Sequence, residues 1–284
     1  MRGRERGPAG RAVDPRMGEP AQPSLYADPL IYDVLHGPGT AEEADAIERI
    51  AARFVEKDPA RMVYLEPACG TARILRALAR RGRRVAGFDL SDSMIAFARE
   101  RLASIAPEPG ARAFVADMAR FAGELDRASI DCAFCTINTI RHLPDDESMR
   151  ACLGEMARVL TPRGVFIVGI NLSDWRIEGA TEDVWDARRG SMRVRQIVQY
   201  LPPTDAASAR RRRERVISHV TVETPTRVVH DDCAYDLRCY SEAQWCELVE
   251  RSAMVELGVV DERARDVEAP APTYALRVLG RRKR

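Results

Sequence analysis

The sequence predicts an α/β protein built on a parallel sheet with helices on both faces. From Met62 onward, apolar strand-like runs alternate with helix-like stretches. Two of these runs end in an acid, Glu66 and Asp89, and the first leads directly into a turn of small residues. Right-handed crossovers between such units place the carboxyl ends of the strands on one edge, where ligands bind in open α/β sheets.

The segment before this alternation has a different composition. Residues 1–22 are rich in Arg, Gly and Pro and lack apolar periodicity, so we expect a flexible tail. An aromatic-rich stretch over 25–35 follows. Thr40, with Glu43 three residues later, predicts a capping box that opens a helix bearing Ile47 and Ile50 on one side.

The alternating region supplies the expected core. Its strands are predicted at 62–66, 85–89, 113–116, 130–136 and 165–170, with helices at 72–81, 92–104 and 145–160. After Asn171 the pattern changes to period two over 193–200, over 215–222 and in a stretch ending at Tyr240, which predicts an antiparallel insert. A helix over 241–253 and strands at 255–260 and 274–279 complete the chain. The predicted division is therefore a core of 23–170 and 241–280, which includes the N-terminal segment, and a β insert of 171–240.

The turn after the first strand, Glu66-Pro-Ala-Cys-Gly-Thr-Ala, resembles that of class I S-adenosylmethionine-dependent methyltransferases. Gly70 matches the central glycine of the family turn, while Ala68 and Ala72 stand where glycines are commoner. The resemblance implies a Rossmann-like, seven-stranded, mostly parallel sheet with an antiparallel last strand. It also implies S-adenosylmethionine as the cofactor, and the insert would then follow strand five.

Asp89 is the strongest candidate for cofactor binding. It follows Glu66 by 23 positions, at the end of the second strand, where one carboxylate can accept hydrogen bonds from both ribose hydroxyls. The apolar neighbours Leu90 and Met94 would contact the adenine or the ribose. The resemblance implies further cofactor contacts from Tyr32, Glu66, Ala68, Gly70, Arg73, Asp117, Met118, Cys135 and Thr136.

The exit of the fourth strand and the insert supply the acceptor side of the site. His142 and Asn138 are the candidate catalytic residues, with His142 interpreted either as a general base or as a structural hydrogen-bonding group. The insert should cover the open sheet edge. Candidate substrate-binding residues in it are Trp175, Trp185, Tyr200, His219, Tyr235 and Arg238, of which about half would serve only packing.

Composition narrows the class of partner. The formal net charge is +1, which disfavours nucleic acid and anionic membranes and favours a small molecule. The seven cysteines are odd in number and lie mostly in predicted strands and helices, as expected for reduced thiols in the cytoplasm. No run approaches the ~18 apolar residues of a membrane span. Cys132 and Cys135 should point to opposite faces of their strand, so no metal site is expected.

The leading functional hypothesis is methyl transfer to a nitrogen or oxygen of a small molecule by in-line displacement, in a monomer or homodimer. Two alternatives remain open at this point. A nicotinamide-dependent oxidoreductase would need a G-x-G-x-x-G turn, which residues 68–73 match poorly. A non-catalytic cofactor-binding or interaction protein would keep the pocket but close the acceptor site.

Overall fold

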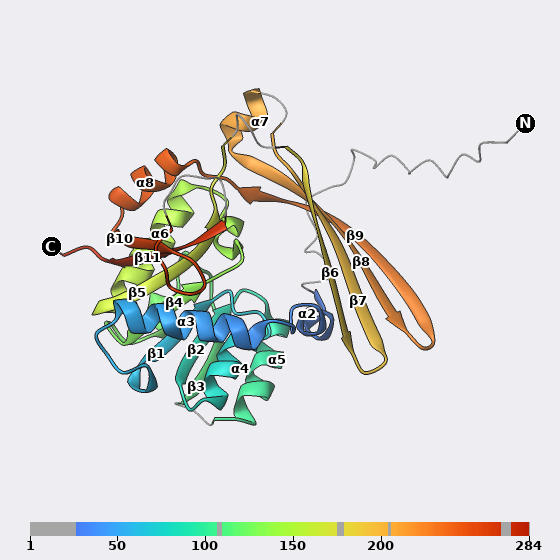
Figure 1. The fold of residues 1–284 in the computed structure, drawn as a ribbon, viewed down its shortest axis with the longest axis horizontal. Helices are drawn as coiled ribbons and strands as arrows, with labels where there is room; N and C mark the ends of the chain where they lie inside the picture. The colour runs from blue at the N-terminus through green and yellow to red at the C-terminus, as the bar shows by residue number, and fades with distance from the viewer. Residues whose placement is uncertain (1–26, 107–109, 175–178, 204–205, 268–273, 284) are drawn as a thin grey trace, which may run out of the picture.

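The computed structural model describes residues 27–106, 110–174, 179–203, 206–267 and 274–283. The predicted tail over 1–22 lies outside these ranges. Within them the chain forms a layered α/β core and a separate antiparallel sheet that stands beside it (Figure 1). None of the helices in the described part of the chain is long and apolar enough to cross a membrane.

The core sheet has the strand order β10-β11-β5-β4-β1-β2-β3. Strands β1 to β5 all run parallel to one another, whereas β11 is antiparallel to both β5 and β10. This topology confirms the predicted fold class. The strands are β1 (Val63–Pro67), β2 (Arg84–Asp89), β3 (Ala111–Val115), β4 (Ile130–Cys135), β5 (Leu160–Asn171), β10 (Met254–Val260) and β11 (Tyr274–Arg281).

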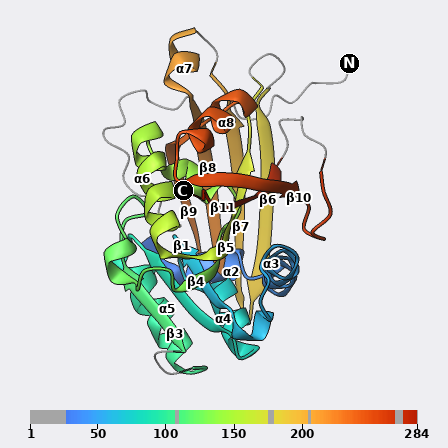
Figure 2. The same cartoon turned by 90° about the vertical axis from the view of Figure 1, so that its left-hand side faces the viewer.

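Helices cover both faces of the core sheet (Figure 2). One face packs against α3 (Thr40–Phe54), α4 (Arg73–Arg80) and α5 (Asp92–Ala103), and the other against α6 (Asp146–Val159) and α8 (Glu242–Glu250). Three short 3-10 helices, η1 (Pro59–Arg61), η2 (Ala122–Glu124) and η3 (Thr139–His142), lie in the connections.

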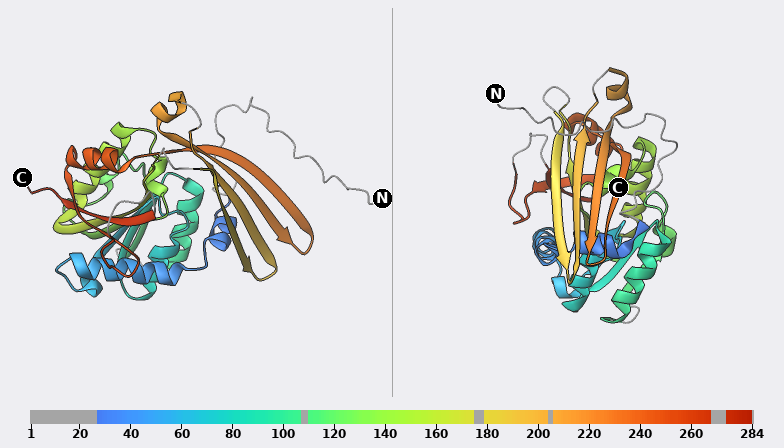
Figure 3. Two further views of the ribbon diagram at one scale, coloured as in Figure 1. Left: turned by 45° about the horizontal axis from the view of Figure 1, so that its top comes forward. Right: turned by 90° about the vertical axis from the view of Figure 1, so that its right-hand side faces the viewer.

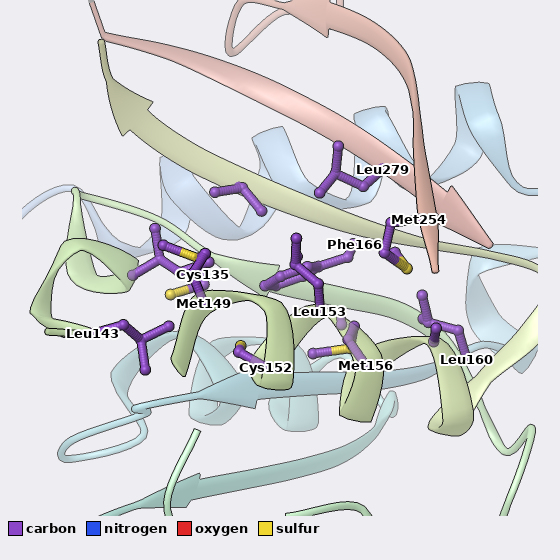
Figure 4. Packing of buried hydrophobic residues seen from close by; sticks show 14 of the residues in the cluster. Cys135, Leu143, Met149, Cys152, Leu153, Met156, Leu160, Phe166, Met254 and Leu279 are labelled. Carbon is purple, nitrogen blue, oxygen red and sulfur yellow. The ribbon is translucent and has the colours of Figure 1, made fainter. Parts of the chain in front are cut away.

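Alternation along the strands divides the apolar residues between two buried clusters. Cys132 belongs to the cluster under α3, α4 and α5, and Cys135 to the cluster under α6 and α8. Figure 4 shows Cys135 beside Met149 of α6. The prediction that these two thiols point to opposite faces is therefore confirmed, because successive strand residues alternate in direction.

The second sheet, called the insert sheet below, has the order β6-β7-β8-β9 with every neighbour antiparallel (Figure 3). Its strands are β6 (Thr181–Arg189), β7 (Met192–Leu201), β8 (Arg213–Thr224) and β9 (Arg227–Arg238), and α7 (Ala206–Arg211) connects β7 to β8. The sequence analysis missed β6. Most of its side chains are exposed, so it lacks the apolar alternation that marks a half-buried strand.

The first described helix, α2 (Pro29–Leu35), packs against the insert sheet. Asp28 caps it by accepting hydrogen bonds from two backbone N–H groups of the first turn. Val34 and Leu35 form a buried cluster with Ala187 and Val194. Since α2 leads directly into α3 of the core, it joins the insert sheet to the core.

The predicted capping box at Thr40 does not form. The residue before α3 is Gly39, which has no side chain to cap the helix, and Thr40 Oγ1 donates to the Gly37 carbonyl at 2.7 Å. Glu43 instead pairs with Arg73 of α4. Glu43 therefore forms an ion pair with an arginine 30 residues away in the chain instead of the capping hydrogen bond that the local sequence predicts.

Candidate active site

The turn between β1 and α4 alternates in and out of the left-handed backbone region. Ala68, Gly70 and Ala72 have φ values of +50°, +50° and +57°. Left-handed alanine costs about 1–2 kcal/mol, which explains why glycines are commoner at these positions. A Cβ on Gly70 would lie 3.3 Å from Cε1 of Tyr32, so the tyrosine ring closes directly over the turn. Strain of this kind is typical of ligand-binding turns.

Asp89 connects the ends of two strands. Its Oδ2 accepts a hydrogen bond from the Gly70 N–H, and its Oδ1 accepts one from the Ser91 N–H, both at 2.9 Å. A carboxylate offers about four lone-pair positions, so two remain available for a ligand. The side chain lines a cavity at the carboxyl ends of the strands.

A cavity of about 390 Å³, called the strand-end cavity, opens at the carboxyl ends of the strands. Small-molecule sites typically occupy ~300–1,000 Å³. Asp89, Leu90, Met94, Asp117 and Met118 all line it, as the sequence analysis expected of cofactor-binding residues. Leu90 is 64% exposed and supplies an open apolar wall, whereas Met94 is buried. The cavity therefore combines acids with an apolar surface, as an adenosine would require.

A second cavity, called the covered cavity, lies between the core and the insert sheet. Cys135, Thr136 and Asn138 line it from the core, and Tyr200 and Tyr235 line it from the insert sheet. It adjoins the strand-end cavity, because the two share Tyr32, Ala68, Thr139, His142 and Tyr235.

Glu66 is buried in the wall of the covered cavity with one oxygen unpaired. Its Oε2 is fully enclosed and has no hydrogen-bond partner among the described residues. Burial raises the pKa of this carboxyl well above its usual range, although the nearby Arg73 opposes the shift. A cationic donor in the cavity would supply the missing partner and favour the ionised form.

Arg73 is already paired. Its Nη1 and Nη2 donate to the two carboxylate oxygens of Glu43 at 2.6 and 2.8 Å, and Nη1 also lies 3.2 Å from Thr40 Oγ1. The side chain is 7% exposed and lines the covered cavity. The guanidinium is thus held by a bidentate ion pair, which places it beside the cavity but commits most of its donors to α3.

His142 stands where the two cavities join. Its ring stacks on Tyr235 with centroids 5.5 Å apart. The ring is accessible from the cavity, yet the surrounding protein desolvates it, and with a smaller contribution from Arg141 this lowers the pKa to about 4. His142 is therefore neutral near pH 7 and can accept a proton.

Asn138 begins η3 in a left-handed conformation, with φ of +61°. Its Oδ1 accepts a hydrogen bond from the Asn171 N–H at 2.7 Å, and its own N–H donates to the Gly169 carbonyl at 3.0 Å. These bonds tie the exit of β4 to β5. The side chain predicted to be catalytic lines the covered cavity, but its oxygen is used to hold the backbone.

His36 and Gln196 line the covered cavity and were missed by the sequence analysis. The ring of His36 lies between Tyr32 and Trp185, with centroid distances of 4.5 and 5.2 Å. Burial, with a smaller contribution from Arg73, lowers its pKa to about 3. His36 belongs to no sequence motif, so its position in the cavity wall becomes evident only from its contact with Trp185 of the insert sheet.

His219 does not line either cavity, which corrects the expectation that it binds substrate. It lies on β8 between Ser218 and Val220, whose side chains are buried on the inner face. Because strand residues alternate, His219 points to the outer face, where it pairs with Asp232 of β9.

Arg238 does not line either cavity, which corrects the expectation that it binds substrate. Its neighbour Leu237 lines the covered cavity, whereas Arg238 donates to Asp146 Oδ1 at 3.0 Å and to the Arg211 carbonyl at 2.7 Å. It therefore ties β9 to the start of α6. Trp175, another predicted substrate contact, lies outside the described residues, while Trp185 lines the covered cavity.

A protein-family model matches part of the chain. Residues 65–164 match the family model described as a methyltransferase domain, which confirms the predicted resemblance. The dTDP-3-amino-3,6-dideoxy-alpha-D-glucopyranose N,N-dimethyltransferase of Streptomyces fradiae is 32% identical over 139 residues, or 49% of this chain and 51% of that protein. The chain spans about half the length of the curated relatives it matches.

Solved structures share the fold across nearly the whole chain. The sugar N-methyltransferase KedS8 from Streptoalloteichus sp. ATCC 53650 is 20% identical, covers 98% of this chain and 100% of its own, and has a TM-score of 0.68. DesVI from Streptomyces venezuelae is 20% identical, with 91% and 98% coverage and a TM-score of 0.67. At this identity the likeness concerns the fold, including both the core and the insert sheet.

Proposed function

Because residues 65–164 match the model of a methyltransferase domain, we propose that this chain transfers a methyl group from S-adenosylmethionine to an amine of a small molecule. One observation carries the proposal. The strand-end cavity, suited to an adenosine, adjoins the covered cavity, whose walls come from both the core and the insert sheet. With the adenosine of the cofactor in the first cavity and its methionine part beside Glu66 in the second, an acceptor in the covered cavity would meet the cofactor near His142.

The chain's own residues fit this cofactor. Asp89 would hold the ribose hydroxyls, and Asp117 and Met118 would contact the adenine. The unpaired Oε2 of Glu66 fits a cationic amino group, which the methionine part of the cofactor carries. When bound, S-adenosylmethionine supplies an activated methyl group. Side chains held at the ends of fixed strands orient a ligand, and orientation can account for ~7–11 kcal/mol of a barrier.

Charge around the acceptor side favours an amine over an oxygen acid or a phosphate ester. A third cavity shares Thr136, Trp185 and Tyr200 with the covered cavity. Among the residues that the structure describes, its lining has no lysine or arginine but includes Glu42, Asp183 and Glu262, together with Glu43, whose charge is balanced by Arg73. Such a lining attracts a cationic acceptor. The name of the S. fradiae relative, which describes an amino-sugar dimethyltransferase, agrees with this choice.

His142 is the group that would accept the proton released by the amine. It is neutral at pH 7, and its contact with Tyr235 holds the ring at the junction of the cavities. The aromatic side chains of Tyr32, Trp185 and Tyr200 would exclude water and bind a cationic amine through their ring faces.

The proposal is tested first by calorimetry with S-adenosylmethionine, S-adenosylhomocysteine and NAD. Heat from NAD alone would favour an oxidoreductase and contradict the proposal. Mass spectrometry should then follow methylation of amino sugars and of matched sugars with a hydroxyl in place of the amine. We expect products 14 or 28 mass units heavier, about one or two methylene masses, only from the amines. Cofactor binding without any product would indicate a non-catalytic protein.

Replacing His142 by asparagine should lower kcat about 100-fold, at the lower end of the ~10²–10⁴ range for general bases, because a group of pKa about 4 is a weak base. Cofactor affinity should stay within twofold, about 0.4 kcal/mol. Steady-state kinetics and calorimetry check this, with His230→Asn on the exposed part of β9 as the control. Equal kcat in the His142→Asn and His230→Asn variants would assign His142 a structural role.

Since His142 is neutral well above pH 4, the wild-type pH profile should show no inflection from this ring near pH 6.5, the usual imidazole pKa.

A further inference from the structure

A cavity outside the proposed active site is lined by basic side chains from two parts of the fold. Arg76 and Arg80 extend from α4, and Arg188 and Arg189 come from the end of β6. The turn between α2 and α3, at 37–39, and the first residues of α3 close one side. On α4, positions four apart lie on the same face. We call this the arginine cavity; its lining includes Arg73, which it shares with the covered cavity.

Arg76 is the least satisfied of these side chains. It is 16% exposed, and its Nε and Nη1 are enclosed without a hydrogen-bond partner among the described residues. Asp33 Oδ1 lies 3.8 Å from Nη1, which is too long for a hydrogen bond, and this oxygen also has no hydrogen-bond partner among the described residues. Buried donors are normally paired, and even a closer contact between Nη1 and Asp33 would leave Nε without an acceptor.

The carboxylates nearby are too few to balance these arginines. Asp33 is shared by Arg76, Arg101 and Arg189, the last at 2.7 Å from Oδ2. Glu43 is occupied by Arg73, and the cavity lining has one further carboxylate, Glu42, beside five arginines. Burial and the neighbouring Arg101 lower the pKa of Arg76, whereas Asp33 raises it. The excess of positive charge is therefore concentrated at the cavity.

We propose that the arginine cavity binds a phosphate or diphosphate group. Guanidinium groups form paired hydrogen bonds with phosphate oxygens, and several arginines together match more than one negative charge. A single carboxylate would leave most of them unpaired. The arginine cavity adjoins the acidic cavity that favours an amine, because both linings include Gly39 and Glu42.

Binding here would also connect the parts of the fold that surround the covered cavity. The anion would bridge α4 of the core and the end of β6 in the insert sheet. Asp33 and Arg189 already join α2 to β6, with Arg189 Nη2 donating to the Asp33 carbonyl at 2.8 Å. Tyr32, which precedes Asp33 in α2, and His36, which follows the helix, both line the covered cavity.

Calorimetry on the full chain at constant ionic strength tests the proposal with inorganic pyrophosphate. We expect saturable binding that Arg76→Gln weakens at least about tenfold, since charge-assisted hydrogen bonds from the guanidinium to the anion are lost. Arg150→Gln, an exposed arginine of α6 outside the cavity, serves as the charge-matched control and should bind as the wild type does. Absence of saturable binding in the wild type, or equal affinity in Arg76→Gln, would overturn the proposal.

Two further arms complete the experiment. If Arg76→Gln does not fold, as judged by circular dichroism, the double variant Arg80→Gln/Arg188→Gln takes its place, because both side chains are exposed; it must also bind pyrophosphate more weakly. Thymidine diphosphate distinguishes the source of the group. Tighter binding than pyrophosphate would identify a phosphate carried by a nucleotide, and equal or weaker binding a free inorganic anion.

Discussion

Asp89→Ala is expected to weaken S-adenosylmethionine binding at least about 100-fold, because two charge-assisted hydrogen bonds at ~1.5 kcal/mol each are lost. Its carboxylate also accepts hydrogen bonds from Gly70 and Ser91, so a stability loss of ~1–2 kcal/mol should accompany the change. Calorimetry gives the affinity, and urea denaturation gives the free energy of unfolding.

Two variants separate these effects. Asp89→Asn keeps one acceptor oxygen and should lose less affinity than the alanine variant. Asp92→Ala removes an exposed acid from the first turn of α5 and controls for net charge. If folded Asp89→Ala bound the cofactor as tightly as Asp92→Ala does, the strand-end cavity would not be the ribose site.

Arg141→Met is expected to lower the free energy of unfolding by about 3–5 kcal/mol. Arg141 is 3% exposed, and its guanidinium bonds to Glu214 Oε2 at 2.7 Å and to the Arg238 carbonyl at 2.9 Å. These contacts tie η3, which carries His142, to β8 and β9 of the insert sheet. Removing the cation leaves Glu214 largely buried without its charge partner, which is why the loss should be large.

Urea denaturation with two comparison variants tests this explanation. Arg158→Met removes an arginine that is 59% exposed and pairs with Glu155, and such surface pairs contribute only ~0–1 kcal/mol. Arg141→Met/Glu214→Leu should recover part of the stability, because no unpaired charge remains. A single Arg141→Met variant no less stable than Arg158→Met would contradict the proposed role.

The core fold could be predicted because its signals are local. Alternation of apolar strands and helices defines each βαβ unit within a few tens of residues, and crossover handedness then places the strand ends on one edge. Glu66 and Asp89 lie at the ends of their strands and Asp117 follows β3, so their joint position at that edge needed no knowledge of side-chain packing. The seven-stranded topology follows from the same pattern together with the family resemblance.

The insert sheet was predicted only in part. Its period-two segments indicated strands, but a one-residue change of register reverses the face of every side chain. His219 and Arg238 were assigned to the cavity on residue type alone, and the strand pairing places both on the other face. The same pairing brings Trp185 and Tyr200 into the covered cavity.

The sequence by itself determined the α/β core, the turn at 66–72 and the acids that follow its strands, because periodicity and chain direction act over short distances. The tertiary structure alone decided the pairing of Arg73 with Glu43, the position of His36 between two aromatic rings and the meeting of α4 arginines with β6. These contacts join residues far apart in the chain, and their ion pairing and desolvation depend on the packing of whole elements against one another.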